Sequence, residues 1–269
     1  WSFDESGRIE KPSASNGSTE SWTYERGIST LGKLLGRRTS AQTLMETRVA
    51  QLRWSNGRWR VTDTEAGSHG PFDAVLLTPP APQTATLLKD TAAALIEGRL
   101  TDGVASLADV VYDVRYHAQF TYVFGFDRTI ERAGPYHGLL NTDGGHDIAW
   151  IGFEHDKPGR ASDGENIIVI QMSPDWTRSR VDADPDSFLP AAKEHASDVL
   201  GVSLKRPTWY DTQRWRYSMP VEGANVNALA DGADAGLFFA GDYVAGVGRI
   251  GPAIETGLDA AARIGDHFA

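Results

Sequence analysis

The residues best suited to chemistry lie near the end of the chain, where an apolar run ends in Gly241-Asp242. A glycine-rich loop follows, and a helix is expected to begin at Pro252. Proline lacks a backbone N–H, but the first turn of a helix does not use that group in a hydrogen bond. The free N–H groups and positive end of such a helix favour an anion, a phosphate or an electron-rich ring. The Asp242 carboxylate could accept hydrogen bonds from sugar or ribityl hydroxyls. A turn that only packs the chain end has the same pattern.

The segment Gly246–Gly251 also spells G-x-G-x-x-G, which is the dinucleotide fingerprint when it opens a strand–helix–strand unit. Only the residues after Gly251 remain for that unit, and they suffice for one helix without a second strand. The segment is therefore not expected to start a Rossmann unit.

Both ends of the chain combine strand and helix patterns around this motif. Two β-rich runs flank Asn56-Gly57, the pair that most favours a tight hairpin. Asp73–Pro79 predicts a buried strand, because its apolar run is continuous, and Pro79-Pro80 ends it. The hairpin strands are expected over 43–54 and 58–63, a last strand over 236–240, and helices over 27–35, 83–96 and 252–268.

The middle of the chain has a different pattern, with long runs of β-branched and aromatic residues. Strands are expected at 110–126, 148–153, 166–172 and 208–217, with one helix at 185–200. Long strands with few helices favour an antiparallel or mixed sheet. Residues 2–21 are polar and aperiodic, which predicts a loop or frayed arm. The fold class is therefore α/β, with a domain built from both ends and a sheet-rich domain inserted.

Composition narrows the function. The apolar share of 41% and charged share of 23% indicate a globular chain, and the absence of cysteine excludes a thiol nucleophile and a Cys-ligated metal. The net charge of −10 argues against nucleic acid as a partner. Neither an apolar run long enough for a membrane span nor a metal-binding histidine pattern occurs, so no membrane partner and no metal are expected. We expect an acidic, cytoplasmic protein.

The stretch Phe238–Ala261 resembles the C-terminal flavin-binding signature of FAD-dependent amine oxidoreductases, especially their renalase-like branch. Further segments resemble the same family in the same order along the chain. They are 47–52, 76–83 (similar to an "ATPAPQ" turn), 155–160 (similar to "SKPGR") and 213–220. The likeness runs from about Gly27 to the C-terminus.

The resemblance implies a flavoprotein oxidoreductase of the amine oxidase type that transfers a hydride from an amine or a reduced nicotinamide-type substrate to FAD. It implies cofactor contacts for Val49 near the adenine, for Thr78 and Pro79 near the ADP part, and for Gly241, Asp242, Arg249, Ile250 and Gly251 near the flavin. It places Trp215, Arg216 and Tyr217 in the substrate pocket. It identifies no catalytic acid or base.

The implied architecture is two-domain and flavoprotein-like. An incomplete FAD-binding α/β domain is expected from 27–80 and 236–269. A substrate domain with a mixed or antiparallel sheet and helices is expected over 81–235, and a loop or arm over 1–26.

Two departures from the family stand out. Gly251-Pro252 stands where the family usually has Glu-Gly. Family members also open with a strand–G-x-G-x-x-G–helix–strand unit that holds the FAD pyrophosphate, and Trp1–Trp22 has neither its glycines nor its strand. The start at Trp1 predicts a cut, processed or partial sequence.

We therefore expect a small-molecule substrate, and a missing N-terminal segment or a separate chain that completes the FAD site. Residues 1–269 alone should bind FAD weakly or not at all. The alternative is a truncated or split, non-catalytic member that acts as a binding or assembly subunit.

Overall fold

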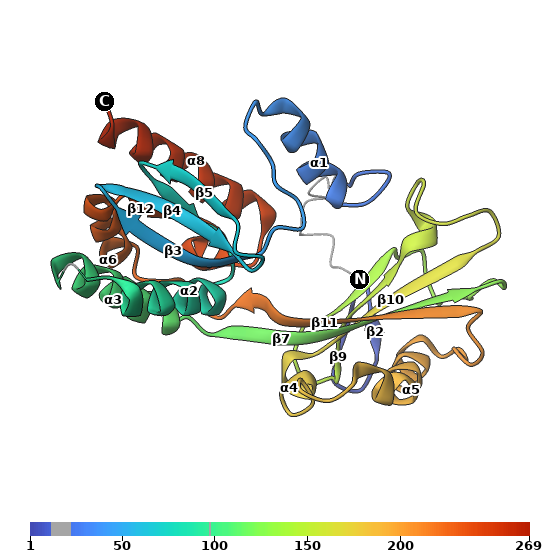
Figure 1. Cartoon of the computed structure of the whole chain (residues 1–269). Coiled ribbons are helices and arrows are strands. Elements are labelled where there is room, and N and C mark those ends of the chain that lie inside the picture. Colours follow the sequence, from blue (N-terminus) through green and yellow to red (C-terminus); the bar gives the residue numbers. More distant parts are fainter. Residues whose placement is uncertain (12–22, 97) are drawn as a thin grey trace. The chain divides into compact units, whose positions relative to one another are not determined.

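The structure is a computed structural model that describes residues 1–11, 23–96 and 98–269 (Figure 1). These residues form two compact units, 1–43 with 118–216 and 44–117 with 217–269. The chain passes between the units within two long strands, β7 (Tyr116–Phe126) and β11 (Trp209–Pro220). The bounds differ from those of the expected domains, since residues 81–117 and 217–235 cluster with the chain's C-terminal segment.

The first unit is built on a mixed sheet. Among the described residues its strands lie in the order β11-β7-β10-β9-β8-β1-β2, with β1 and β8 parallel and the pairs β7–β10, β10–β9 and β9–β8 antiparallel. Its remaining elements are β1 (Ser2–Phe3), β2 (Ile9–Glu10), α1 (Ser29–Arg38), β8 (Gly138–Asn141), β9 (Ile148–Phe153), β10 (Asn166–Met172), α4 (Pro174–Arg178), α5 (Leu189–Leu200) and the 3-10 turns Glu154–Asp156 and Pro185–Phe188.

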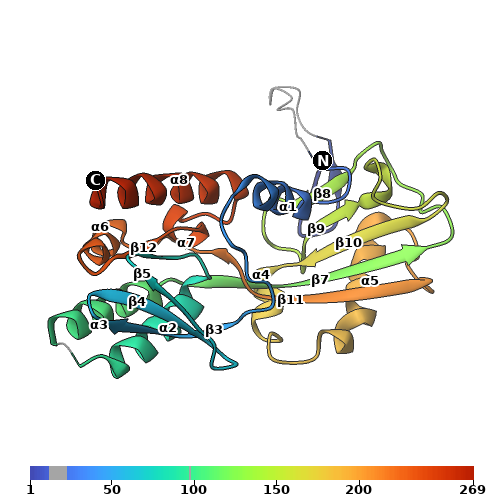
Figure 2. The ribbon, with the colours of Figure 1, turned by 45° about the horizontal axis from the view of Figure 1, so that its top comes forward.

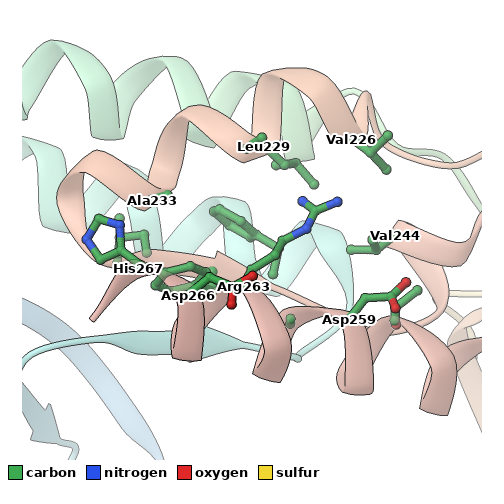
Figure 3. A pocket seen from close by; sticks show the side chains of 14 residues that line it. Val226, Leu229, Ala233, Val244, Asp259, Arg263, Asp266 and His267 are labelled. Carbon is green, nitrogen blue, oxygen red and sulfur yellow. The ribbon is translucent and has the colours of Figure 1, made fainter. Parts of the chain in front are cut away.

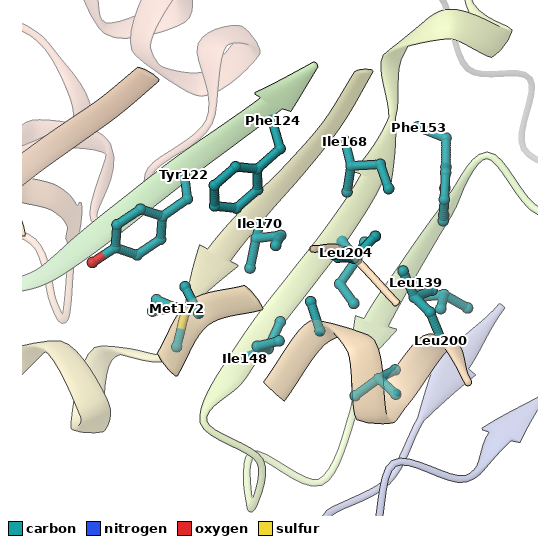
Figure 4. Close-up of a cluster of buried hydrophobic side chains, with 14 of the residues drawn as sticks. Tyr122, Phe124, Leu139, Ile148, Phe153, Ile168, Ile170, Met172, Leu200 and Leu204 are labelled. Carbon is teal, nitrogen blue, oxygen red and sulfur yellow. The ribbon is translucent and has the colours of Figure 1, made fainter. Parts of the chain in front are cut away.

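The core of this unit lies between the sheet and helix α5 (Figure 4). Alternate residues of β7, from Phe120 to Phe126, are fully buried, as the period of two along a strand requires. The helix contributes Ala192, Ala196 and Val199, which are spaced to share one face. The mixed sheet with covering helices confirms the mixed α/β class expected from the sequence.

The described residues of the second unit form two smaller sheets (Figure 2). Its elements are β3 (Val49–Ser55), β4 (Arg58–Asp63), β5 (Ser68–Phe72), β6 (Val75–Leu77), α2 (Ala81–Ala94), α3 (Gly98–Tyr112), α6 (Val226–Ala230), the 3-10 turn Asp231–Ala235, β12 (Leu237–Phe239), α7 (Asp242–Ala245) and α8 (Ile250–His267). Strands β3 and β4 form the predicted hairpin, and both Asn56 and Gly57 have the positive φ that its tight turn requires.

The two ends of this unit lie in one sheet, as expected of a domain built from both ends of the chain. Strand β6 pairs in parallel with β12, so that Val75 lies opposite Leu237 and Leu77 opposite Phe239. The two strands lie side by side in the sheet although about 160 residues separate them in the chain. Leu77, Leu237 and Phe239 belong to a core that also includes residues of α2, α3 and β4.

Several expected elements are corrected. The strand expected from Val110 begins at Tyr116, because Val104, Leu107, Ala108 and Val111 are spaced to bury one face of helix α3. The expected N-terminal arm contains β1 and β2, since Phe3 is fully buried and β1 pairs with β8; residues 12–22 lie outside the described part. The strand expected from residue 43 begins at Val49.

Candidate functional site

The turns that follow β6 and β12 lie side by side, because parallel strands end at the same edge of a sheet. This brings Thr78 and Pro79, which the family resemblance places near the ADP part of the cofactor, next to Gly241 and Asp242, which it places near the flavin. Gly241 has φ 122° and ψ −172°, a combination that is essentially restricted to glycine. A side chain added there would lie 3.5 Å from the Thr78 carbonyl oxygen, so the two turns are close neighbours.

Side-chain hydroxyls fix both turns. The Thr256 hydroxyl accepts the Gly241 N–H at 2.9 Å, and Thr84 donates to the Pro79 carbonyl, also at 2.9 Å. The buried Tyr243 donates to the Leu77 carbonyl at 3.0 Å. These three bonds connect α8, α2 and α7 to the strand ends, so the exposed part of the site rests on a fixed backbone.

Asp242 begins the short helix α7, where a glycine-rich loop was expected. The Tyr116 hydroxyl donates to its Oδ1 at 2.7 Å. Burial, followed by this hydrogen bond, raises the pKa of Tyr116 well above its usual range. The rings of Tyr116 and Tyr217 meet edge to face, with centroids 5.6 Å apart. Tyr116 was missed because 126 positions separate it from Asp242 and no local pattern links them.

The start of α8 is open. The helix begins at Ile250, two residues before the expected position, and Pro252 lies within its first turn. Arg249, Ile250 and Gly251 are exposed, and a Cβ at Gly251 would have no neighbour within 4 Å. The Arg249 N–H donates to the Val247 carbonyl at 2.8 Å, and the exposed turn at Ile250 and Gly251 carries N–H groups that a first helical turn leaves without an intrahelical partner.

The remaining predicted cofactor residue, Val49, is the first residue of β3 and is exposed. It pairs with Asp63 across the hairpin. The interactions that join the two turns do not include it.

Two of the predicted substrate residues lie in the first unit and point to opposite faces of β11, as neighbours on a strand do. The Trp215 indole N–H donates to the Thr121 hydroxyl at 3.1 Å. Arg216 instead pairs with Asp182 at 2.8 Å, and both side chains are largely exposed. Arg216 is thus not brought to the side of Trp215.

The segment 155–160, which carried part of the family resemblance, makes interactions within its own unit. Asp156 accepts hydrogen bonds from Arg132. Burial acts to raise the pKa of Asp156, but the bonds from Arg132 help to hold this pKa below its usual value. His155 accepts the Ile167 N–H at 3.1 Å. The segment therefore has a structural role within the first unit.

A separate cavity of about 660 Å³ is lined by residues of α6, β12 and α8 (Figure 3). Leu229, Phe239 and Ala260 form apolar walls, and Asp259 and Arg263 line the α8 side. It includes none of the predicted site residues. Within the described ranges, no cluster of three or more metal-binding side chains occurs, and no helix is long and apolar enough to cross a membrane.

Comparison with known proteins supplies the family context. Residues 5–265 match the sequence profile of the flavin-containing amine oxidoreductases. Over 120 residues the chain is 29% identical to the chloroplastic protoporphyrinogen oxidase 1 of Spinacia oleracea. The match covers 41% of this chain and 21% of that protein.

Solved structures agree in fold. A protein assigned as a protoporphyrinogen oxidase from Exiguobacterium sp. 255-15 superposes with a TM-score of 0.62 at 16% identity, over 88% of this chain and 51% of that one. A fatty acid isomerase from P. acnes gives 0.63 at 13% identity, over 90% and 53%. A putrescine oxidase variant gives 0.64 at 12%, over 88% and 52%. The chain thus spans about half the length of these structures.

Proposed function

Because the chain belongs to the flavin-containing amine oxidoreductase family, we propose that it forms part of an FAD-dependent oxidoreductase. The substrate class that we propose is an amine or a reduced nicotinamide-type molecule that gives a hydride to the flavin. The renalase-like assignment rests on the segments 155–160 and 213–220 and is part of the same proposal. The cytoplasmic location expected from the sequence also stays a prediction.

The observation that carries the proposal is the chain of contacts from Tyr217 through Tyr116 to Asp242. It joins a residue assigned to the substrate pocket with one assigned to the cofactor. Beside it lie the two strand-end turns, including the glycine-only backbone at Gly241.

The residues present fit FAD at this place. Asp242 offers a carboxylate oxygen to a ribityl hydroxyl, and the open first turn of α8, at Ile250 and Gly251, offers backbone N–H groups to a ring edge that gains negative charge. Bound FAD would supply the hydride-accepting chemistry, and the chain's residues hold the cofactor, orient it and exclude water.

We also propose that a further polypeptide segment completes the site along the open edge of β6. The hydrogen bonds from Val75 N–H to Gly236 and from Ala240 N–H to Leu77 direct Val75 and Leu77 toward β12. By alternation, the N–H and C=O of Leu76 point away from β12. Among the described residues no strand pairs with that edge.

Exposed apolar side chains of the same unit support the same proposal. Leu76, on the strand with the open edge, is exposed. Along α8, Ile250, Ile254 and Leu258 form an exposed apolar stripe at helical spacing. Asp259 and Arg263 line the α6 cavity, so the stripe lies on the other flank of the helix. An apolar parallel strand followed by a helix has the chemistry to cover both surfaces.

The experiment is a visible spectrum of the longest natural product of this gene, followed by anaerobic addition of amines and of reduced nicotinamides. We expect bound flavin and bleaching of its oxidised band by at least one of these substrates. A product that contains no flavin and takes up none from solution would contradict the proposal.

A second candidate, a non-catalytic binding or assembly subunit, is favoured by the open edge of β6 alone. The coding sequence upstream of Trp1 discriminates between the two. An in-frame strand–G-x-G-x-x-G–helix supports the enzyme, and its absence supports the subunit.

A further inference from the structure

Tyr116 contacts Asp242 in the candidate site, and the sequence analysis did not predict this contact. It is the first residue of β7, its side chain is partly buried, and its hydroxyl is 2.7 Å from Asp242 Oδ1. A single side chain thus connects the start of β7 with the turn after β12.

The protonation state of Tyr116 is fixed in the physiological range. Burial is the main cause of its raised pKa, and the Asp242 carboxylate is the next. The hydroxyl therefore remains a donor, and Asp242 Oδ1 remains its acceptor. Among the described residues, the Asp242 side chain has no second hydrogen bond or ion pair and is half-buried, so Oδ2 is available to a ligand.

The packing of the ring also favours a fixed geometry. Tyr217 meets it edge to face at an interplanar angle of 67°. Edge-to-face is one of the arrangements that aromatic pairs prefer, so this contact favours one position of the Tyr116 ring.

We propose that Tyr116 is the positioning residue of Asp242: it holds Oδ1 inside the protein and leaves Oδ2 to accept a hydroxyl of the bound cofactor. This inference rests on the proposed function, because it takes the ligand to be FAD. It adds a residue that does not touch the cofactor but sets the orientation of one that does. Without it, the carboxylate rotates freely about its side-chain bonds and loses preorganisation for the ligand.

The test is a double-mutant cycle on FAD affinity in the intact protein, measured by titrating the apoprotein with FAD. Tyr116→Phe keeps the ring against Tyr217 and removes only the hydroxyl. We expect it to weaken FAD binding by roughly tenfold, which corresponds to about 1.4 kcal/mol. In the Asp242→Ala background the same substitution should change the affinity less than about twofold, because its partner is gone. A general loss of stability from Tyr116→Phe would appear equally in both backgrounds.

The matched control is Tyr122→Phe. Tyr122 is also buried, but its hydroxyl donates to the Pro185 carbonyl in the other unit, so this variant should bind FAD as the parent protein does. If Asp242→Ala weakens binding but Tyr116→Phe does not, or if Tyr116→Phe costs the same in both backgrounds, the positioning role is wrong and the proposed function stands. If Asp242→Ala itself leaves binding unchanged, the cofactor assignment fails, and the role of Tyr116 fails with it.

Discussion

Replacing Gly241 with alanine measures how much the backbone conformation of the turn that carries Asp242 affects the free energy of unfolding. The added Cβ would lie 3.5 Å or more from its nearest non-adjacent atoms, which is ordinary contact, so crowding contributes little. The backbone at φ 122° and ψ −172° is nearly forbidden to alanine, and holding a residue in such a region costs about 1–3 kcal/mol. We therefore expect Gly241→Ala to lower the free energy of unfolding by about that amount.

Gly257→Ala is the matched control. Gly257 lies inside α8 with ordinary helical geometry, and a Cβ there would have no neighbour within 4 Å. Alanine in place of glycine inside a helix stabilises by about 0.5–1 kcal/mol. Urea unfolding followed by circular dichroism should therefore separate the two variants by about 1.5–4 kcal/mol. Equal stability of the two variants would refute the claim that the Gly241 backbone is strained.

Three further predictions concern the cores and one titrating group. Leu139→Ala should destabilise by about 2–5 kcal/mol in denaturant unfolding and Leu140→Ala by less than about 0.5, since Leu139 is fully buried and its neighbour is 52% exposed. Trp59→Phe should cost about 1–2 kcal/mol in the same assay, because it strands the Ala235 carbonyl that accepts the indole N–H. Burial, and then the nearby His195, lowers the pKa of His146, so the native state binds fewer protons than the unfolded one. This contribution to stability is complete above the ordinary histidine pKa near 6.5 and is lost as the pH falls through the lower folded value; thermal unfolding at several pH values should show a shallower loss in His146→Asn.

Local patterns predicted those parts of the fold that depend on local chemistry. Asn56-Gly57 specified the hairpin, because its turn needs two residues that tolerate positive φ. The apolar runs before Thr78 and before Gly241 predicted two strands, and the strand and helix patterns at both ends of the chain predicted that they belong to one domain.

Features that depend on contacts between distant parts of the chain could not be predicted from local patterns. The segment Val110–Tyr112 contains β-branched residues, yet it ends helix α3 because the spacing of Val104, Leu107 and Val111 buries one helix face. Phe3 lies in a polar segment, and its strand forms by pairing with β2 and with the distant β8. The bond from Tyr116 to Asp242 is likewise a product of the tertiary fold.

The central claim is that the turn at Gly241-Asp242 holds a flavin, and flavin retention by the Asp242→Ala variant of the intact protein tests it most directly. Stranding hydrogen bonds to a charged group costs about 1–3 kcal/mol, so FAD affinity should fall by roughly 5- to 150-fold, while circular dichroism stays that of the parent protein. Asp259→Ala, on the α8 flank that faces the α6 cavity, should retain its flavin. Full flavin content and unchanged affinity in Asp242→Ala would contradict the account and leave the turn with a packing role alone.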